Sequence, residues 1–358
     1  MTTGPGEVPR DDAAAPAAVA RPSYLRRRGL MPHHAATGRY ALRRTVTEFL
    51  RDDMVDEAAG LTYWSVLSLL PAVLAMVSIL GVVGQAETTT RALLDFMHEL
   101  VDDDVADILA QPISDFASRP GAGWLLILGL VGAMWFASNY TQAFTRALNR
   151  MYRVEEGRPA LLGLLLGYLL TALLVVLLAV VAVLLVVSGT FAEAFVRFLE
   201  LPPEVVLAWT VGKWPVLVLF VLLAIALLYY FSPNVVPRAF SLITPGALVA
   251  FAVGAVATAG LGVFVANFPS FNYYYGALTG VLVFLLWLFV INLALLFGAQ
   301  LNAELERGVE LEAGLPAERD LQLRIRSTRS SEKRTERYGQ LIRRAEALRR
   351  TGGRSSRE

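Results

Sequence analysis

Uncharged polar side chains lie inside stretches that are otherwise apolar and long enough to cross a bilayer, where they could bind a ligand. Asn139 lies fifteen residues after Trp124, which is about 22 Å along a helix that runs toward the cytoplasm. Asn292 lies sixteen residues into the last such stretch, about 24 Å along it. Ser65 and Ser68, early in the first stretch, fall near the same depth. The pattern predicts a polar cavity that opens to the cytoplasm.

These four side chains also admit a simpler interpretation. Asparagine and serine inside membrane helices commonly form hydrogen bonds between helices, each worth about 0.6 kcal/mol. The residue types and their depth slightly favour this second interpretation over the cavity.

Basic side chains near the ends of the apolar stretches could meet an anionic group. Lys213, beside Trp214, could bind an anionic substrate, although a lysine at this depth commonly extends its amine to the interface. Arg146, Arg150 and Arg238 ring the expected cytoplasmic face, where arginines can hold lipid phosphates. The same arginines are also explained by membrane topology alone.

Other kinds of chemistry are poorly supplied. The chain has no cysteine and three histidines, so neither disulfides nor a metal site are expected. No G-x-x-x-x-G-K-[ST] motif for nucleotide phosphates occurs. The apolar stretches hold no pair of carboxylates for phosphodiester hydrolysis. We therefore expect no enzyme activity, no cofactor and no specific nucleic-acid partner.

The composition predicts the elements that position these residues. Of the 358 residues, 55% are hydrophobic and 18% are charged, against about 25% charged in soluble domains. The apolar residues form six runs, each near or above the roughly 20 residues that a membrane helix needs. We expect an all-α integral membrane protein with six transmembrane helices near 61–84, 122–142, 160–188, 206–231, 242–266 and 276–303.

The flanking and connecting segments follow from charge. Lys and Arg gather before the first span, after the second and fourth, and after the sixth, which predicts that both termini lie in the cytoplasm. Residues 1–40 are expected to be a disordered tail, 41–58 an amphipathic interfacial helix, 85–121 a helical extracytoplasmic loop, and 307–358 a basic tail that is largely disordered or partly helical.

Small residues recur every fourth position through the fifth span, and the stripe predicts close helix packing. We favour packing over a second interpretation, a gliding surface for transport movements, and expect the fifth helix to lie well inside the bundle. The stripe consists of Gly246, Ala250, Gly254, Thr258 and Gly262.

The stretch "FPSFNYYYGALTG" (268–280) gathers aromatic residues between the fifth and sixth spans. Tyr273, Tyr274 and Tyr275 fall at the depth where aromatic rings favour the boundary of lipid and water. We interpret the segment as an interfacial hairpin at the outer face, with a ligand-stacking platform as the alternative.

Four stretches together resemble the YihY/BrkB family of bacterial inner-membrane proteins, which has also been labelled ribonuclease BN. They are "AAGLTYWSVLSLLPAVLAMVSILG" (58–81), "TRALNRMYRVEEGRP" (145–159), "YYFSPNVVPRAFSLITPGALVA" (229–250) and "FPSFNYYYGALTGVLVFLLWLFVINLALLFGAQLNAELE" (268–306). The resemblance covers about 41–306 and implies the same six-span layout and an envelope-related role. The family pattern has Glu where this chain has Gln300, so Gln300 joins the expected cavity, with Glu304 as a substitute carboxylate.

Our first hypothesis is a transporter or flippase-like or scramblase-like protein for a lipid or other amphiphile. It rests on the six spans, the possible polar pocket, the amphipathic interfacial helices and the absence of a nucleotide-binding motif. The resemblance also implies lipid or amphiphile transport. The second hypothesis is a membrane scaffold whose tails recruit envelope proteins. A membrane-bound ribonuclease ranks last. Membrane lipids are the expected partners, and the residues indicate neither the substrate nor the oligomeric state.

Overall fold

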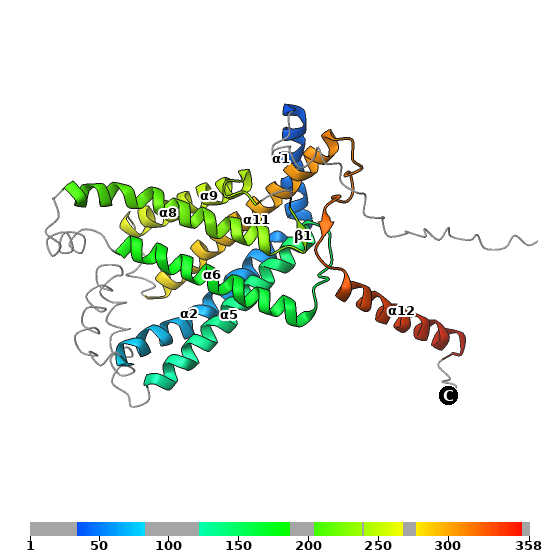
Figure 1. Cartoon of the computed structure of the whole chain (residues 1–358), viewed down its shortest axis with the longest axis horizontal. Helices are drawn as coiled ribbons and strands as arrows, with labels where there is room; N and C mark the ends of the chain where they lie inside the picture. Colours follow the sequence, from blue (N-terminus) through cyan, green and yellow to red (C-terminus); the bar gives the residue numbers. More distant parts are fainter. Residues whose placement is uncertain (1–33, 83–121, 187–203, 238–239, 268–276, 353–358) are drawn as a thin grey trace, which may run out of the picture.

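The computed structural model describes residues 34–82, 122–186, 204–237, 240–267 and 277–352. Six long helices occupy the six apolar stretches (Figure 1): α2 (Met54–Val82), α5 (Ala122–Met151), α6 (Ala160–Val186), α8 (Glu204–Phe231), α9 (Pro245–Asn267) and α11 (Ala277–Glu312). One shorter helix precedes the six in the sequence and one follows them: α1 (Ala35–Arg51) and α12 (Arg329–Arg350). The described chain also has two short strands, β1 (Val235–Val236) and β2 (Arg324–Ile325).

Four of the six long helices, α6, α8, α9 and α11, are long and apolar enough to cross a membrane, judged over the described residues. The predominantly helical fold and the membrane character of the chain are therefore confirmed. The count of six spans and the side on which the termini lie stay predictions.

The long helices pack as three pairs. α2 lies against α5, α6 against α8, and α9 against α11, while α11 also contacts α2 and α5 and so joins the pairs. Figure 1 shows the helices converging near α1 and β1. Gly132 of α5 passes close to Pro71 of α2, since a Cβ on this glycine would lie 3.0 Å from the proline Cβ. The residue without a side chain thus lets α5 approach the proline-containing helix.

The buried core lies at the end of the bundle where α1 packs. Phe144, Leu148, Leu296 and Ala299 are all at most 2% exposed there. Side chains farther along the helices are mostly exposed, as expected for helices that face lipid.

The expectation that the fifth span lies well inside the bundle is wrong. Helix α9 buries Gly246, Ala247 and Ala250 near its start, whereas Val256 and Val263 are exposed. α9 packs on α11 and touches α8, so it lies at the periphery.

The single amphipathic helix expected over 41–58 is two helices. α1 begins at Ala35 and ends at Arg51, and α2 begins at Met54. Asp53 between them has a φ of 54°, a left-handed conformation that aspartate tolerates better than most residues. The turn directs α1 along the end of α11, where Ala41, Thr45 and Phe49 become buried.

Local capping fixes two further ends. The Thr244 hydroxyl accepts a hydrogen bond from the Ala247 N–H at 3.1 Å, which caps α9 just before Pro245. Helix α11 ends at Glu312, and Gly314 just after it has a φ of 77°, which suits glycine. The chain then returns to the bundle through β2, which pairs antiparallel with β1.

Candidate functional site

Most of the predicted cavity residues are engaged in hydrogen bonds within the bundle. Asn292 is 2% exposed. Its Oδ1 accepts a hydrogen bond from the Tyr140 hydroxyl at 2.9 Å, and its Nδ2 donates to Thr62 Oγ1 at 3.1 Å. The Ser65 and Ser68 hydroxyls donate to carbonyls of their own helix. Asn292 therefore ties α11 to α5 and α2.

Asn139 and Gln300 complete the predicted set. Asn139 is half-buried on α5. Gln300 is buried, and its Nε2 donates to Glu304 Oε1 at 3.4 Å while its own Oε1 has no hydrogen-bond partner among the described residues. None of the five predicted cavity residues lines the large groove described below.

Glu304, the expected substitute carboxylate, belongs to a buried ionic cluster. Its Oε2 lies 2.9 Å from Arg307 Nε and 3.3 Å from Arg44 Nε of α1. Glu304 and Arg307 are both 1% exposed. Farther along α1, Glu48 accepts a hydrogen bond from Arg153 at 2.9 Å. The cluster thus holds α1 against the ends of α11 and α5.

The small-residue stripe approaches α11 over its first half. A Cβ on Gly246 would lie 1.9 Å from the Gly298 carbonyl oxygen, and one on Gly254 would lie 3.2 Å from Ile291 Cδ1. Ala250, which lies between these two glycines in the sequence, is also buried. Beyond, the remaining members are exposed: Thr258 accepts a hydrogen bond from Trp287 Nε1 at 3.0 Å, and Gly262 has open space around it.

The predicted interface residues have different surroundings. Lys213 is buried, with Nζ 5.6 Å from the ring centroid of Trp214. Arg150 is exposed and forms an ion pair with Glu57 at 2.9 Å. Arg238 and the tyrosines at 273–275 lie outside the described residues.

A groove of about 1600 Å³ gathers segments that are far apart in the sequence. Its walls come from the second half of α5, the α5–α6 loop, the start of α6, the end of α8, the residues after β2 and the first half of α12. One wall is apolar and consists of α6 leucines: Leu162, Leu164, Leu166, Leu169, Leu170 and Leu173. The basic residues of the groove are Arg146, Arg150, Arg158, Arg326, Arg334 and Arg337.

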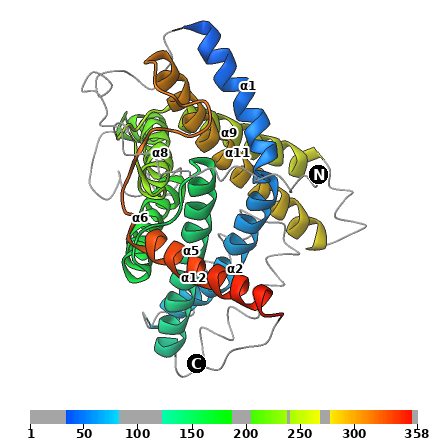
Figure 2. The same cartoon turned by 90° about the vertical axis from the view of Figure 1, so that its right-hand side faces the viewer.

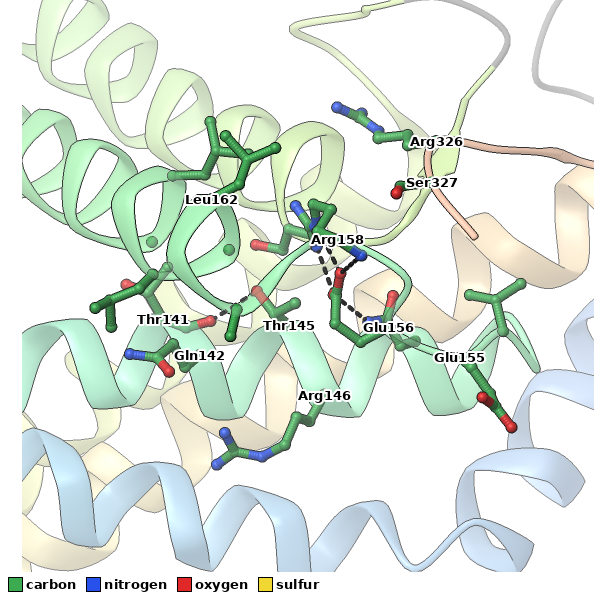
Figure 3. A pocket seen from close by; sticks show the side chains of 18 of the residues that line it. Thr141, Gln142, Thr145, Arg146, Glu155, Glu156, Arg158, Leu162, Arg326 and Ser327 are labelled. Atoms are coloured by element: carbon green, nitrogen blue, oxygen red, sulfur yellow. Dashed lines mark hydrogen bonds and ion pairs between the residues drawn. The ribbon is translucent and has the colours of Figure 1, made fainter. Parts of the chain in front are cut away.

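Arg158 is already paired. Its Nε and Nη2 donate to the two carboxylate oxygens of Glu156 at 2.7 and 2.8 Å, and Nη2 also donates to the Ser232 carbonyl (Figure 3). Burial opposes ionisation of Glu156, but the hydrogen bonds from Arg158 outweigh burial and lower the pKa of this carboxyl. The pair therefore forms a neutralised part of the groove wall.

Arg326 and Arg334 hold backbone carbonyls. Arg326 donates to Val235 and Tyr230, and Arg334 donates to the Glu156 carbonyl. Burial lowers the pKa of Arg326. Both arginines serve the fold of the groove wall.

Arg146 and Arg337 differ from the other basic groups of the groove. Among the described residues, neither makes a hydrogen bond or an ion pair. Arg146 projects from α5 away from Arg158 (Figure 3), and Arg337 lies on α12. Within the part of the chain that the structure describes, all the donors of these two guanidinium groups are left for an anion.

Arg146 and Arg150 could be predicted from the sequence, but the groove could not. The tail that supplies Arg326, Arg334 and Arg337 was expected to be largely disordered or partly helical. A partial signal existed, since Leu341, Ala345 and Leu348 recur at helical spacing.

Comparisons with known proteins give the chain's relatives. A family model described as virulence factor BrkB matches residues 45–321. The ribonuclease-like protein YfkH of Bacillus subtilis (strain 168) is 25% identical over 260 residues, which are 71% of this chain and 91% of YfkH. No solved structure matches.

Longer relatives are named membrane proteins. A UPF0761 membrane protein of Rhodospirillum centenum (strain ATCC 51521 / SW) is 30% identical over 268 residues, 74% of this chain and 57% of the relative. Another from Alkalilimnicola ehrlichii (strain ATCC BAA-1101 / DSM 17681 / MLHE-1) is 29% identical over 263 residues, 72% of this chain and 56% of the relative. The chain thus spans little more than half the length of these two proteins.

Proposed function

The chain belongs to the BrkB family of membrane proteins, and from that premise we propose that it binds an anionic lipid or similar amphiphile and moves it between leaflets. The groove beside α6 is the proposed binding site. We further propose that this movement does not use nucleotide hydrolysis directly, as in a scramblase.

The observation that carries the proposal is the contrast between the walls of the groove. The α6 wall offers leucines, and the α5 and α12 walls offer Arg146 and Arg337. An amphiphile has the same contrast, with an apolar chain and a charged head. Arginine suits a phosphate because its planar guanidinium can donate two parallel hydrogen bonds.

The size of the groove suits the same ligand. Small-molecule sites commonly measure about 300–1,000 Å³, and this groove, at about 1600 Å³, is larger. The leucine face of α6 includes side chains that are exposed outside the groove, such as Leu161 and Leu165. An acyl chain could therefore pass from the bilayer into the groove along one continuous apolar helix face.

A matched pair of double variants tests the site. Arg146→Gln with Arg337→Gln removes the two uncommitted cations. Arg343→Gln with Arg350→Gln removes the same charge from exposed positions of α12 that do not line the groove. Each full-length protein is reconstituted in vesicles with a trace of fluorescent phosphatidylglycerol, and dithionite reports its movement between leaflets.

In vesicles that contain the wild type or the control variant, labelled lipid should become accessible to dithionite faster than in protein-free vesicles. The groove variant should lose most of that rate. Equal rates in all three proteins would remove the groove from the mechanism. If the wild type moves no lipid, and native mass spectrometry finds no retained phosphatidylglycerol, a scaffold role becomes the better account.

We also propose that both termini lie in the cytoplasm. The native chain lacks cysteine, so Gln340→Cys provides a single reactive thiol on α12. A membrane-impermeant maleimide should label intact inner-membrane spheroplasts only after permeabilisation. Labelling of intact spheroplasts would place α12 outside the cytoplasm and contradict the proposed orientation.

A further inference from the structure

Helix α12 carries an apolar face that no part of the described chain covers. Tyr338, Leu341, Ile342, Ala345 and Leu348 follow the helical spacing of three and four residues. No residue of α12 is buried, and the exposed fractions of Tyr338 and Leu348 are 66% and 51%. A helix with this pattern commonly lies with its apolar side against another apolar surface.

The start of α12 is fixed in place. The Ser327 hydroxyl donates to the Gly157 carbonyl at 2.8 Å, and the Ser330 N–H donates to the same oxygen at 2.9 Å. A Cβ on Gly157 would lie 1.9 Å from the Ser327 carbonyl oxygen, so only glycine permits this contact. Asn234 Nδ2 adds hydrogen bonds to the carbonyls of Glu155 and Ser327.

This anchor sets the level of α12 relative to a bilayer. Gly157 lies three residues before Ala160, where the apolar span of α6 begins. Helix α12 therefore starts at the boundary where α6 enters the hydrocarbon region. Figure 2 shows α12 in front of α5, and Figure 1 shows that it begins beside the start of α6 and extends away from the bundle.

The apolar face of α12 looks into the same space as the lipid-facing side of α6. Tyr338 and Leu341 line the groove together with the α6 residues Leu162 and Leu166. These two residues of α12 therefore border the same open groove as the exposed leucines of α6.

Charge on α12 complements an anionic surface. The helix has eight Lys and Arg residues against three Glu. At 100° per residue, Arg337 and Arg344 flank the apolar face, whereas Glu336 points to the opposite side. Arg334 and Arg349 fall within the arc of the apolar face, one toward each end of the helix. Basic side chains beside an apolar stripe are typical of helices that lie in the headgroup region of anionic membranes.

We propose that α12 is an interfacial helix that binds the surface of an anionic bilayer at the end where α6 enters it. Its apolar face enters the boundary of headgroups and acyl chains, and its arginines contact lipid phosphates. The inference does not depend on lipid transport, because α12 can lie on the membrane whether or not the groove holds an amphiphile.

Single cysteines in the full-length protein test the orientation of α12. Ala345→Cys places a fluorescent label in the middle of the apolar face, and Gln340→Cys places it on the polar side five residues away. The labelled proteins are reconstituted in vesicles of phosphatidylcholine alone or mixed with phosphatidylglycerol. Quenching is measured with nitroxide-bearing lipids and with an aqueous nickel chelate.

In the mixed vesicles, the label at position 345 should be quenched several-fold more by nitroxide lipid than the label at position 340. Nickel should show the reverse order. The 345 label should lie about 5–10 Å below the headgroup boundary. Equal nickel quenching at both positions would mean that α12 projects into water, and a 345 label shielded from both quenchers would mean that protein covers the face. Either result overturns the proposal.

Lipid composition and salt test the role of charge. Each arginine near an anionic surface shifts the equilibrium constant for membrane binding by about five-fold, so nitroxide quenching at position 345 should fall in phosphatidylcholine alone and in high salt. Quenching that is independent of both would overturn recognition of anionic lipid. If the protein moves no lipid between leaflets but the label at position 345 is quenched as expected, only the proposed transport function would be contradicted.

Discussion

Replacing Gly246 by alanine tests how closely α9 and α11 must approach. The new Cβ would lie 1.9 Å from the Gly298 carbonyl oxygen and 2.7 Å from the Asn302 side chain. The helices would have to separate by about 1 Å, because a carbonyl oxygen of the facing backbone cannot rotate away; overpacking of this kind costs about 1–3 kcal/mol. The hydrogen bond from the Gly246 N–H to Asn302 Oδ1, now 2.9 Å, would also weaken, at about 1 kcal/mol.

The expected loss is therefore about 2–4 kcal/mol, which corresponds to a fall in melting temperature of roughly 5–10 °C. Gly262→Ala is the matched control, because it makes the same change in the same helix at a position with open space. Alanine there should leave the melting temperature unchanged or raise it, since alanine favours a helix over glycine by about 1 kcal/mol. Tryptophan fluorescence in detergent follows both transitions.

A reciprocal variant sharpens the test. A Cβ on Gly298 would lie 2.3 Å from the Gly246 carbonyl oxygen. One separation of the helices relieves both contacts, so the Gly246→Ala, Gly298→Ala double variant should lose less stability than the two single losses added. The close approach is refuted if Gly246→Ala and Gly262→Ala melt at the same temperature.

Three further changes test the polar contacts. Asn292→Leu should lower the melting temperature, through interhelical hydrogen bonds worth about 0.6 kcal/mol each, and leave lipid movement intact; Asn139→Leu is the control. Arg307→Leu removes the buried partner of Glu304 and leaves only the ion pair with Arg44, so it should cost up to about 3–5 kcal/mol in a chemical denaturation series. The pKa of Glu156 is below its ordinary 4.5, so its contribution to stability holds above that pH and fades as pH falls through the lowered pKa. Glu156→Gln should flatten that acid dependence of melting, and an unchanged profile would contradict it.

The positions of the long helices could be predicted because the bilayer leaves few choices. A segment in hydrocarbon must satisfy its backbone hydrogen bonds internally, so a long apolar run becomes a helix. The helix starting at Ala160 lies where its run begins, and Pro245 begins α9 within three residues of the expected start. The last helix continues past its apolar run to Glu312, because Glu304 and Arg307 satisfy each other's charge and the polar extension can still be buried.

The depth of Asn292 along its helix could be calculated from the sequence, but its hydrogen-bond partners could not be predicted. The rise per residue gives a position along the helix axis, whereas the choice between a cavity and a hydrogen bond depends on helix rotation and on which helix is adjacent. The same holds for the small-residue stripe. Its period was visible, but two crossing helices touch over a limited length, so Gly246 meets α11 and Gly262 does not.

The groove could not be predicted, because the sequence of each segment does not show which other segments it contacts. β1 and β2 have two residues each, too short for an alternating pattern, yet they bring residues 326–341 beside residues 154–166. The contact at Gly157 depends on a glycine within a charged loop. Nothing in that loop specifies the tail as its partner.

The distribution of packing suggests where ligand specificity would lie in such a groove. The buried core and the ionic cluster of Glu304 and Arg307 are at the end of the bundle that also holds the polar side of the groove. Arg158 is fixed there by two oxygens of Glu156 and by the Ser232 carbonyl. The leucine side is apolar and largely exposed, and it could accept apolar chains of many shapes because apolar contacts lack direction. A ligand would therefore be selected by its head group, while its chains would be interchangeable.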